Sequence, residues 1–260
     1  MSRLIFDIGA HVGEDTELYL KKGFRVVAVE ANPDLAEQLN SRFLNEIRSG
    51  SLVVVDKAIS DHPTVTFFRN TRQSIWGTTD PAWAARNAAL GSPSEIIQVQ
   101  GISCKALLRQ YGIPYYMKVD IEGADLSCVR ALSGEIELPD YVSIESNKVS
   151  WQVLRDEFDL FESLGYNKFK IVDQRRIRKQ RPPYPSREGI YVKHRFQYGS
   201  SGLFGEEVPG DWLDRDTAES VYRRIFRFYH WFGDDSLVRK IPVLRALLRA
   251  SWYDTHAARD

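Results

Sequence analysis

The residues of this chain that are best suited to chemistry lie in short polar segments, each following an apolar run. The first segment contains Asp7, Gly9 and Gly13, and Asp15 and Thr16 follow it. Glycine lets the backbone approach a ligand closely, and the free N–H groups at the start of a helix attract anionic groups. A strand that ends in such a turn is typical of a nucleotide-like binding site in a parallel sheet.

Each residue of this turn has a predicted role. Asp7 would hold an ammonium group or its water shell, and Gly9 and Gly13 would let the chain pass under the ligand. Asp15 and Thr16 would cap the next helix or contact a carboxylate. The alternative is a plain strand–turn–helix connection whose glycines serve geometry alone. The spacing is G-x-x-x-G and not G-x-G-x-x-G, which favours S-adenosylmethionine over NAD.

Two further segments offer groups for the rest of such a ligand. Glu30 ends the second apolar run, where an acid of a doubly wound sheet accepts hydrogen bonds from ribose hydroxyls. Asn32 would assist Glu30, or would only cap the helix that starts at Pro33. Asp56, or the backbone near Ala58, would contact the purine edge. The same two residues are equally typical of a simple loop.

The candidate catalytic groups follow a later apolar run. Lys118, Asp120 and Glu122 alternate there, and the chain turns at Gly123. Alternate residues of a strand share a face, so Lys118 and Asp120 are expected side by side at the carboxyl edge of the sheet. Asp120 or Glu122 is the candidate base that would deprotonate a hydroxyl nucleophile, and His11 is a second candidate. Lys118 would tune the carboxylate, and the alternative is a salt-bridged strand end.

Glu145 and Asn147 end the next predicted strand and are expected to flank the same crevice. Together with Asp120 they present oxygen ligands that would suit Mg²⁺. A substrate clamp without a metal is the preferred interpretation.

The long segment 69–93 is predicted as a loop with one short helix. Loops of this length are usually functional or mobile. Trp76, Thr78 and Trp83 lie in it and are the predicted lining of an acceptor pocket, where two indoles would stack on a sugar. The alternative is an aromatic patch that closes the edge of the core.

The elements that must position these residues follow from hydrophobic periodicity. Strands are predicted at residues 4–8, 25–30, 52–55, 64–68, 96–100, 115–120, 141–145, 168–172 and 189–192. Helices are predicted at residues 12–22, 33–47, 104–111 and 151–164, and after Gly123. This alternation predicts a parallel sheet covered by helices.

The C-terminal part differs from the rest of the chain. A soft boundary near residue 198 divides a main domain, residues 1–198, from a C-terminal helical extension, residues 199–260. Two basic, aromatic-rich helices are predicted at residues 217–231 and 237–252. Such helices can dock on their own domain, form a homodimer, cap a substrate site or make peripheral contact with an anionic membrane. Docking or dimerisation is preferred.

Composition narrows the class of protein. The 260 residues are 43% hydrophobic, which is enough to build a sizeable core. Lys+Arg and Asp+Glu balance at 35 each, so the net charge gives no attraction to nucleic acid. The two cysteines form no C-x-x-C pair, and neither a disulfide scaffold nor a zinc site is expected. Since no membrane-length apolar run exists, we expect a soluble, cytoplasmic protein.

Taken together, four segments resemble the FkbM family of S-adenosylmethionine-dependent methyltransferases. They are FDIGAHVG at residues 6–13, VEANP at 29–33, KAISD at 57–61 and KVDIEGAD at 118–125. The resemblance covers roughly residues 3–195, with Asp125 in place of the usual glutamate. Residues 102–104 depart from the Thr-Leu-Asp that the family often has there, so no role is carried over to them.

The resemblance implies the class I methyltransferase fold. This is a Rossmann-like α/β fold with a seven-stranded, mostly parallel sheet, an antiparallel last strand and helices on both faces. It also implies O-methylation of a sugar, glycan or natural product, with S-adenosylmethionine as the methyl donor. On this resemblance Ala10 and Ala31 join the cofactor-binding residues.

Two other functions compete with this one. An NAD(P)-dependent oxidoreductase also uses a glycine turn and a ribose-binding acid, but the third glycine is missing here. A non-catalytic, cofactor-binding assembly protein would use the C-terminal part as its partner surface. The presence of both Asp120 and Glu122 disfavours that second alternative.

Overall fold

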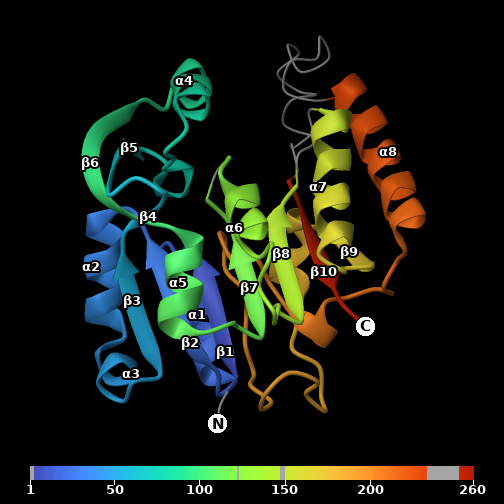
Figure 1. Cartoon of the computed structure of the whole chain (residues 1–260), viewed down its shortest axis with the longest axis horizontal. Coiled ribbons are helices and arrows are strands. Elements are labelled where there is room, and N and C mark those ends of the chain that lie inside the picture. The colour runs from blue at the N-terminus through green and yellow to red at the C-terminus, as the bar shows by residue number, and fades with distance from the viewer. Residues whose placement is uncertain (1–2, 122, 147–149, 233–251) are drawn as a thin grey trace.

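A seven-stranded sheet forms the centre of the molecule (Figure 1). The computed structural model describes residues 3–121, 123–146, 150–232 and 252–260. The strand order is β3-β2-β1-β7-β8-β10-β9, and only β10 runs antiparallel to its neighbours. The strands are β1 (Leu4–Ile8), β2 (Arg25–Glu30), β3 (Leu52–Asp56), β7 (Tyr116–Val119), β8 (Tyr141–Glu145), β9 (Lys168–Asp173) and β10 (Tyr253–Ala258). The predicted class I fold is therefore confirmed.

Helices cover both faces of the sheet. One face carries α1 (Glu14–Lys21), α2 (Pro33–Arg42) and α3 (Leu44–Arg48). The other carries α5 (Cys104–Tyr111), α6 (Asp125–Ala131), α7 (Trp151–Ser163) and α8 (Arg215–Phe232). Within β1, Ile5 packs with Tyr19 and Leu39 on the first side, whereas Phe6 and Ile8 belong to the core on the second. Burial on both faces explains why these strands are continuously apolar.

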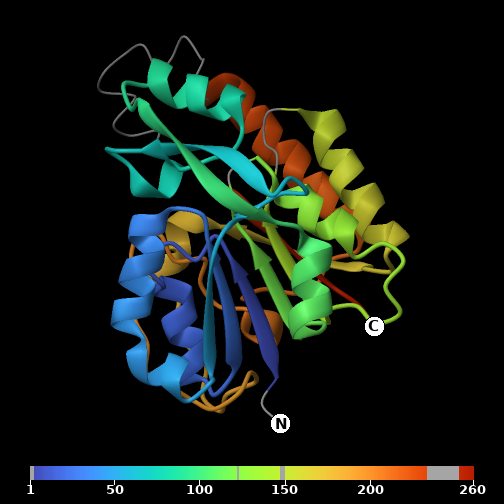
Figure 2. The ribbon, with the colours of Figure 1, turned by 60° about the vertical axis from the view of Figure 1, so that its left-hand side comes forward.

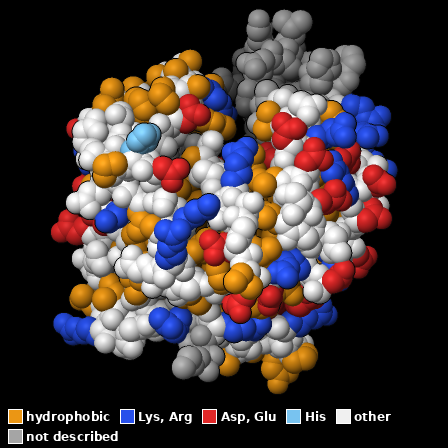
Figure 3. Space-filling view, viewed as in Figure 1, with side chains coloured by type: hydrophobic (Ala, Val, Ile, Leu, Met, Phe, Trp, Pro, Cys, Tyr) orange, Lys and Arg blue, Asp and Glu red, His pale blue; other side chains and the backbone are white. Residues whose placement is uncertain are grey.

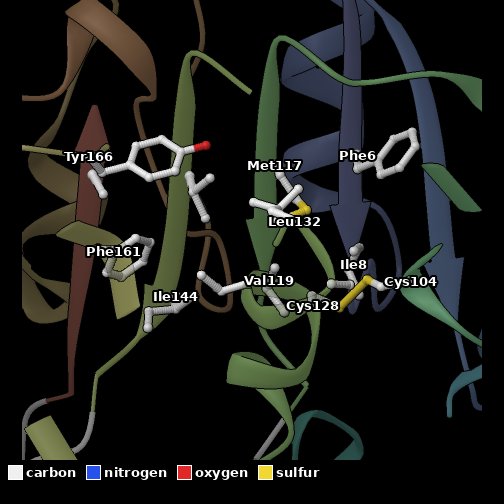
Figure 4. Close-up of a cluster of buried hydrophobic side chains, with 14 of the residues drawn as sticks. Phe6, Ile8, Cys104, Met117, Val119, Cys128, Leu132, Ile144, Phe161 and Tyr166 are labelled. Atoms are coloured by element: carbon white, nitrogen blue, oxygen red, sulfur yellow. A yellow bond between two sulfur atoms is a disulfide. The ribbon is translucent and has the colours of Figure 1, made fainter. Parts of the chain in front are cut away.

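The larger core contains a disulfide between Cys104 of α5 and Cys128 of α6 (Figure 4). This single bridge corrects the expectation, drawn from the sequence, that the two cysteines form no disulfide. The two cysteines are 24 residues apart and carry no short motif. In the chain α5 precedes β7 and α6 follows it. Both helices pack on the same face of the sheet, which brings the two cysteines together.

A smaller, separate unit lies above the carboxyl ends of β1, β2 and β3 (Figures 1 and 2). We call residues 58–102 the arm. It contains β4 (Ala58–Ile59), β5 (Thr64–Asn70), the 3₁₀ helix η1 (Ser74–Trp76), α4 (Pro81–Ala89) and β6 (Ser94–Ile102). The predicted loop 69–93 thus contains η1 and a regular helix, α4. Asp80 caps α4 by accepting the N–H of Ala82, and Pro81 occupies its first turn.

The last strand of the sheet is not where the sequence pattern placed it. Residues 189–192 form no strand, and Ile190 and Tyr191 are exposed. The seventh strand is β10, which lies between β8 and β9. Its sequence, YDTHAA, lacks the β-branched apolar residues that indicate a strand, whereas residues 190–192 contain them. Residues 199–260, predicted as a helical extension, therefore include a strand of the main sheet.

The rest of the C-terminal part also packs on the main domain. The first predicted helix corresponds to α8, which buries Ala218 and Tyr222 in the core. The second, residues 237–252, lies outside the described residues except for Trp252. Among the described helices, none is long and apolar enough to cross a membrane.

Two parts of the segment 180–208 lie at the amino edge of the sheet, one around Glu188 and the other in the 3₁₀ helix η3 (Gly205–Glu207). The fully buried ammonium of Lys22 lies 3.0 Å from a carboxylate oxygen of Glu207 and donates to the carbonyl of Glu188 at 2.8 Å. The Glu188 carboxylate accepts the Tyr115 hydroxyl at 2.7 Å. These buried polar contacts fix the segment in place, because an unpaired charge there would be costly.

The place of β10 gives a direct test of the C-terminal part. A chain that ends before Tyr253 should lose cooperative thermal unfolding in circular dichroism, because β10 is the strand that joins β9 to the rest of the described sheet. A chain that ends at Ala258 keeps β10 and is the control. A native-like melting transition in the shorter chain would contradict the assignment of β10 to the core.

Candidate active site

The turn between β1 and α1 is shaped by a close backbone approach. Gly9 has a φ of 82°, and a side chain there would collide with the backbone oxygen of Asp120. The N–H groups of Gly9 and Ala10 both donate to the carbonyl of Val29, at 2.9 and 3.0 Å. Only glycine fits such a position, so the turn ties β1, β2 and β7 together at their carboxyl ends.

Four charged residues meet under this turn, and we call Asp7, Asp15, Lys118 and Asp120 the ion cluster. The buried ammonium of Lys118 donates to Asp7 and to the carbonyl of Gly9, both at 3.1 Å. It lies 3.6 Å from Asp15 and 3.8 Å from Asp120. The predicted pairing of Lys118 with Asp120 is confirmed, and the register of β1 with β7 adds Asp7 beside it.

Electrostatics keep Lys118 charged. Burial alone would lower its pKa, but the carboxylates of Asp7, Asp120 and Asp15 outweigh burial and raise the pKa of Lys118 well above its ordinary value. Asp7 is fully buried and also accepts the Thr16 hydroxyl at 2.6 Å. Lys118 therefore acts as a fixed cation that orients acids on both sides of the turn.

Glu30 is held at the end of β2 by two backbone donors. Its oxygens accept the N–H groups of His11 and Asn32, both at 2.8 Å. Burial raises the pKa of Glu30 to about 7, and the two N–H donors oppose that rise. A carboxylate has about four lone-pair sites, so these donors orient Glu30 and leave acceptor capacity for a diol. Asn32 caps α2 by accepting the N–H of Asp34 at 3.1 Å.

The residues predicted near the purine lie beside Glu30. Asp56 pairs with Glu30 in the register of β2 and β3, and its side chain is exposed. Ala58 is buried in β4, at the start of the arm, and Ala31 packs against it in a small cluster of the arm. The structure thus places Asp56, Ala58 and Ala31 near the carboxyl ends of β2 and β3.

His11 connects the turn to the arm. Its Nδ1 lies 3.0 Å from Glu14, and its Nε2 lies 2.8 Å from the hydroxyl of Ser74. Its φ of 50° is unusual for a residue with a side chain. Both ring nitrogens are engaged, which suits a tether better than a base. Ser74 was not predicted as a site residue, because nothing in its own segment indicates that it contacts His11, 63 residues away.

The turn after β7 lies on the other side of the ion cluster. Asp120 keeps 40% of its side chain exposed. Asp125 is buried, and its carboxylate accepts the N–H groups of Ile121 at 3.1 Å and Gly123 at 3.3 Å. A side chain on Gly123 would collide with the indole of Trp83, so α4 of the arm packs against this turn.

The other predicted acceptor residues divide into two groups. Trp76 and Thr78 lie in the arm, where the buried Thr78 accepts the N–H of Asp80 at 3.0 Å and so shapes the loop. Glu145 lies at the carboxyl end of β8, opposite Asp254 of β10. Glu122 and Asn147 lie outside the described residues.

Asp254 is an acid of this edge that sequence reasoning missed. It is buried, and burial together with the nearby Asp120 and Glu145 raises the pKa of Asp254 well above its ordinary value. No local signal marks it, because it reaches the edge only through the insertion of β10 beside β8. Among the described residues, no group of three His, Cys, Asp or Glu side chains is arranged to hold a metal ion.

Comparison with known proteins agrees with this geometry. A family model described as the methyltransferase FkbM domain matches residues 7–168. The chain belongs to this family. It is therefore an S-adenosylmethionine-dependent methyltransferase, and the predicted family, enzyme class and cofactor are confirmed.

Individual relatives are more distant. A ribosomal RNA small subunit methyltransferase A of Methanospirillum hungatei is 42% identical over 53 residues, which are 20% of this chain and 21% of that protein. The match thus spans about a fifth of that relative's length.

Solved structures show a weak overall likeness. A precorrin-6y C5,15-methyltransferase from Geobacter metallireducens has 10% identity and a TM-score of 0.41, covering 100% of this chain and 81% of that one. An S-adenosylmethionine-dependent methyltransferase from Archaeoglobus fulgidus has 10% identity and a TM-score of 0.40, covering 99% and 86%. Neither is similar enough to indicate a substrate.

The buried acids predict how stability changes with pH. Burial raises the pKa values of Asp15, Glu30 and Asp125 to about 7. The unfolded chain releases these protons near pH 4, so the folded state binds more protons between about pH 4 and pH 7. The free energy of unfolding should therefore fall as the pH rises through this window and level off above it.

Urea unfolding at pH 5 and pH 7.5 measures this fall. In Asp125→Asn the decrease in the free energy of unfolding between these two pH values should be smaller by at least about 1 kcal/mol, because one of the three groups no longer titrates. Glu37→Gln, which changes an exposed acid of α2, is the control. An equal fall in Asp125→Asn and wild type would contradict the role assigned to Asp125.

Proposed function

We propose that this FkbM-family methyltransferase transfers the methyl group to a hydroxyl of a sugar, glycan or natural product. One observation carries the proposal: the partly exposed carboxylate of Asp120 begins a turn on which the indole of Trp83 packs at Gly123. A base next to an aromatic surface suits a hydroxyl acceptor that has a ring to stack.

The chain's own residues fit S-adenosylmethionine on the donor side. Glu30, oriented by two N–H donors, would accept hydrogen bonds from the ribose hydroxyls. The glycine turn at Gly9 would let the backbone lie against the ligand, and Asp7 would attract its ammonium group. When bound, S-adenosylmethionine supplies an activated methyl group on a sulfonium centre. The ion cluster holds three carboxylates against one ammonium, and that excess of negative charge suits a cationic donor.

Asp120 would take the proton from the acceptor hydroxyl. It differs from the nearby acids in exposure, because Asp7, Asp125 and Asp254 are buried and hydrogen-bonded within the protein. The ammonium of Lys118, 3.8 Å away, would fix the direction of the Asp120 carboxylate. Holding the hydroxyl in line with the methyl group can by itself supply several kcal/mol of rate acceleration.

The arm would form the acceptor side. Trp83 is half-buried against the Gly123 turn, and the guanidinium of Arg86 lies 4.6 Å from its ring centre. Trp76 lies on the same arm in η1. Glu145, and Asn147 with it, would bind acceptor hydroxyls from the β8 side.

A sugar or natural product is preferred to RNA for an electrostatic reason. RNA binding draws on clustered Lys and Arg side chains. Here the formal net charge is zero, and Figure 3 shows acidic and basic side chains interspersed over one face of the molecule. The short match to a ribosomal RNA methyltransferase spans only 53 residues. A homodimer through the C-terminal helices and peripheral membrane contact remain predictions.

The proposal predicts separate effects on binding and on turnover. The wild-type chain should bind S-adenosylhomocysteine in titration calorimetry and should not bind NADH. Metabolite extract from a strain that lacks the gene should contain an acceptor that gains one methylene in mass when protein and donor are added.

Two variants then test the base. Asp120→Asn should lower the rate of that mass gain by about 10²- to 10⁴-fold, since a positioned base contributes that much. Glu122→Gln should lose turnover while still binding S-adenosylhomocysteine. Asp61→Asn changes an exposed acid and serves as the control. Full activity in both Asp120→Asn and Glu122→Gln would sink the assignment of the base.

A further inference from the structure

Residues 199–202, which we call the strap, lie on the first turn of α1. The strap is outside the range that the family model matches, residues 7–168. The backbone N–H of Ser201 donates to both carboxylate oxygens of Asp15, at 3.0 and 2.9 Å. Ser200, Ser201 and Gly202 are buried. A segment predicted as a linker is thus a packed part of the edge where the donor turn lies.

The strap reaches the donor turn along two lines of contact. Along the first, Ser201 holds Asp15, and Asp15 lies 3.6 Å from the ammonium of Lys118. Along the second, a Cβ on Gly199 would lie 3.2 Å from Glu14, which contacts His11 at 3.0 Å. The first line ends on Lys118 of the ion cluster, and the second ends on His11 of the glycine turn.

The position of the strap is fixed from its other side. Gly202 has a φ of 98°, and a Cβ on it would lie 2.6 Å from the side-chain oxygen of Gln180 and 2.7 Å from Ile177. That oxygen of Gln180 accepts the N–H of Leu203 at 2.9 Å. Ile177 belongs to the 3₁₀ helix η2 (Gln174–Lys179), which packs with Leu18 of α1 in one apolar cluster. The strap therefore cannot move without disturbing these contacts.

An unusual polar atom lies within the strap. The hydroxyl of Ser200 is buried and has no hydrogen-bond partner among the described residues. Its neighbours in the chain are Gly199, which lies beside Glu14, and Ser201, which donates to Asp15. A buried hydroxyl without a partner is costly, and such a group is explained when a ligand or water completes its hydrogen bonds.

We infer that the strap is part of the donor site, with Ser201 as a positioning residue that acts through Asp15. This inference rests on the proposed placement of the donor at Asp7, Gly9 and Glu30. The Ser201 N–H holds the carboxylate of Asp15 where it shares Lys118 with Asp7. Without this N–H, which opposes the rise in the pKa of Asp15, Asp15 would hold a proton more firmly or draw Lys118 closer. Either change redistributes charge around Asp7, which is proposed to attract the donor's ammonium group.

Donor binding to full-length variants tests the inference. Ser201→Pro removes the N–H itself, and Gly202→Ala forces the strap away from Gln180. Each should raise the dissociation constant for S-adenosylhomocysteine by about tenfold or more, since a hydrogen bond to a buried charge is lost. Gly210→Ala is the matched control, because Gly210 has a φ of 91° with nothing within 4 Å of its Cβ position. Gly202→Ala and Gly210→Ala incur the same kind of backbone strain. The difference in their affinities for S-adenosylhomocysteine therefore measures the contribution of the strap to binding.

Hydrogen exchange in the wild-type chain gives a second measurement without any substitution. Saturating S-adenosylhomocysteine should slow exchange in a peptide that covers residues 199–202 and leave one that covers residues 208–212 unchanged. Unaltered affinity in both strap variants, or unaltered exchange at the strap, would overturn the inference. Failure of the wild-type chain to bind S-adenosylhomocysteine would instead count against the proposed placement of the donor.

Discussion

The buried ammonium of Lys118 is the interaction on which the rest of the site depends. It joins β7 to the end of β1 through Asp7, to the glycine turn through the carbonyl of Gly9, and to α1 through Asp15. A buried charge that loses its partner costs about 3–5 kcal/mol, so these groups are stable only as a set. The same set places Asp7 and Asp15 beside the glycine turn and Asp120 at the turn after β7, all around a single cation.

The C-terminal part completes this arrangement from outside the range that defines the family. Within residues 180–208, Glu188 and Glu207 hold Lys22 at the amino edge of the sheet, and Ser201 between them reaches Asp15 at the start of α1. After α8, strand β10 enters the sheet beside β8 and adds Asp254 to the acids at the carboxyl edge. The main sheet and the contacts of Asp15 are thus both incomplete without residues that look, in the sequence, like a linker and an appendage.

Local sequence patterns were sufficient for the elements that depend on local physics. The bounds of β1, β2, α5 and β8 agree with the periodicity of their residues, because each is buried on a regular face. The contact of Lys118 with Asp120 followed from alternation along one strand. The Cys104–Cys128 disulfide, strand β10 and the tether between His11 and Ser74 were missed. Each depends on segments that only the three-dimensional fold brings together, and short strands such as Tyr253–Ala258 carry little signal of their own.

The arm contacts both the glycine turn and the turn after β7. It therefore does more than cover the carboxyl edge of the sheet. At the glycine turn, the hydroxyl of Ser74 contacts His11, whose backbone N–H donates to Glu30. At the turn after β7, Trp83 packs on Gly123, whose N–H donates to Asp125. The two turns already touch, because the backbone of Asp120 lies directly against Gly9. The arm, the glycine turn and the turn that Asp120 begins are therefore linked by direct contacts into one connected unit.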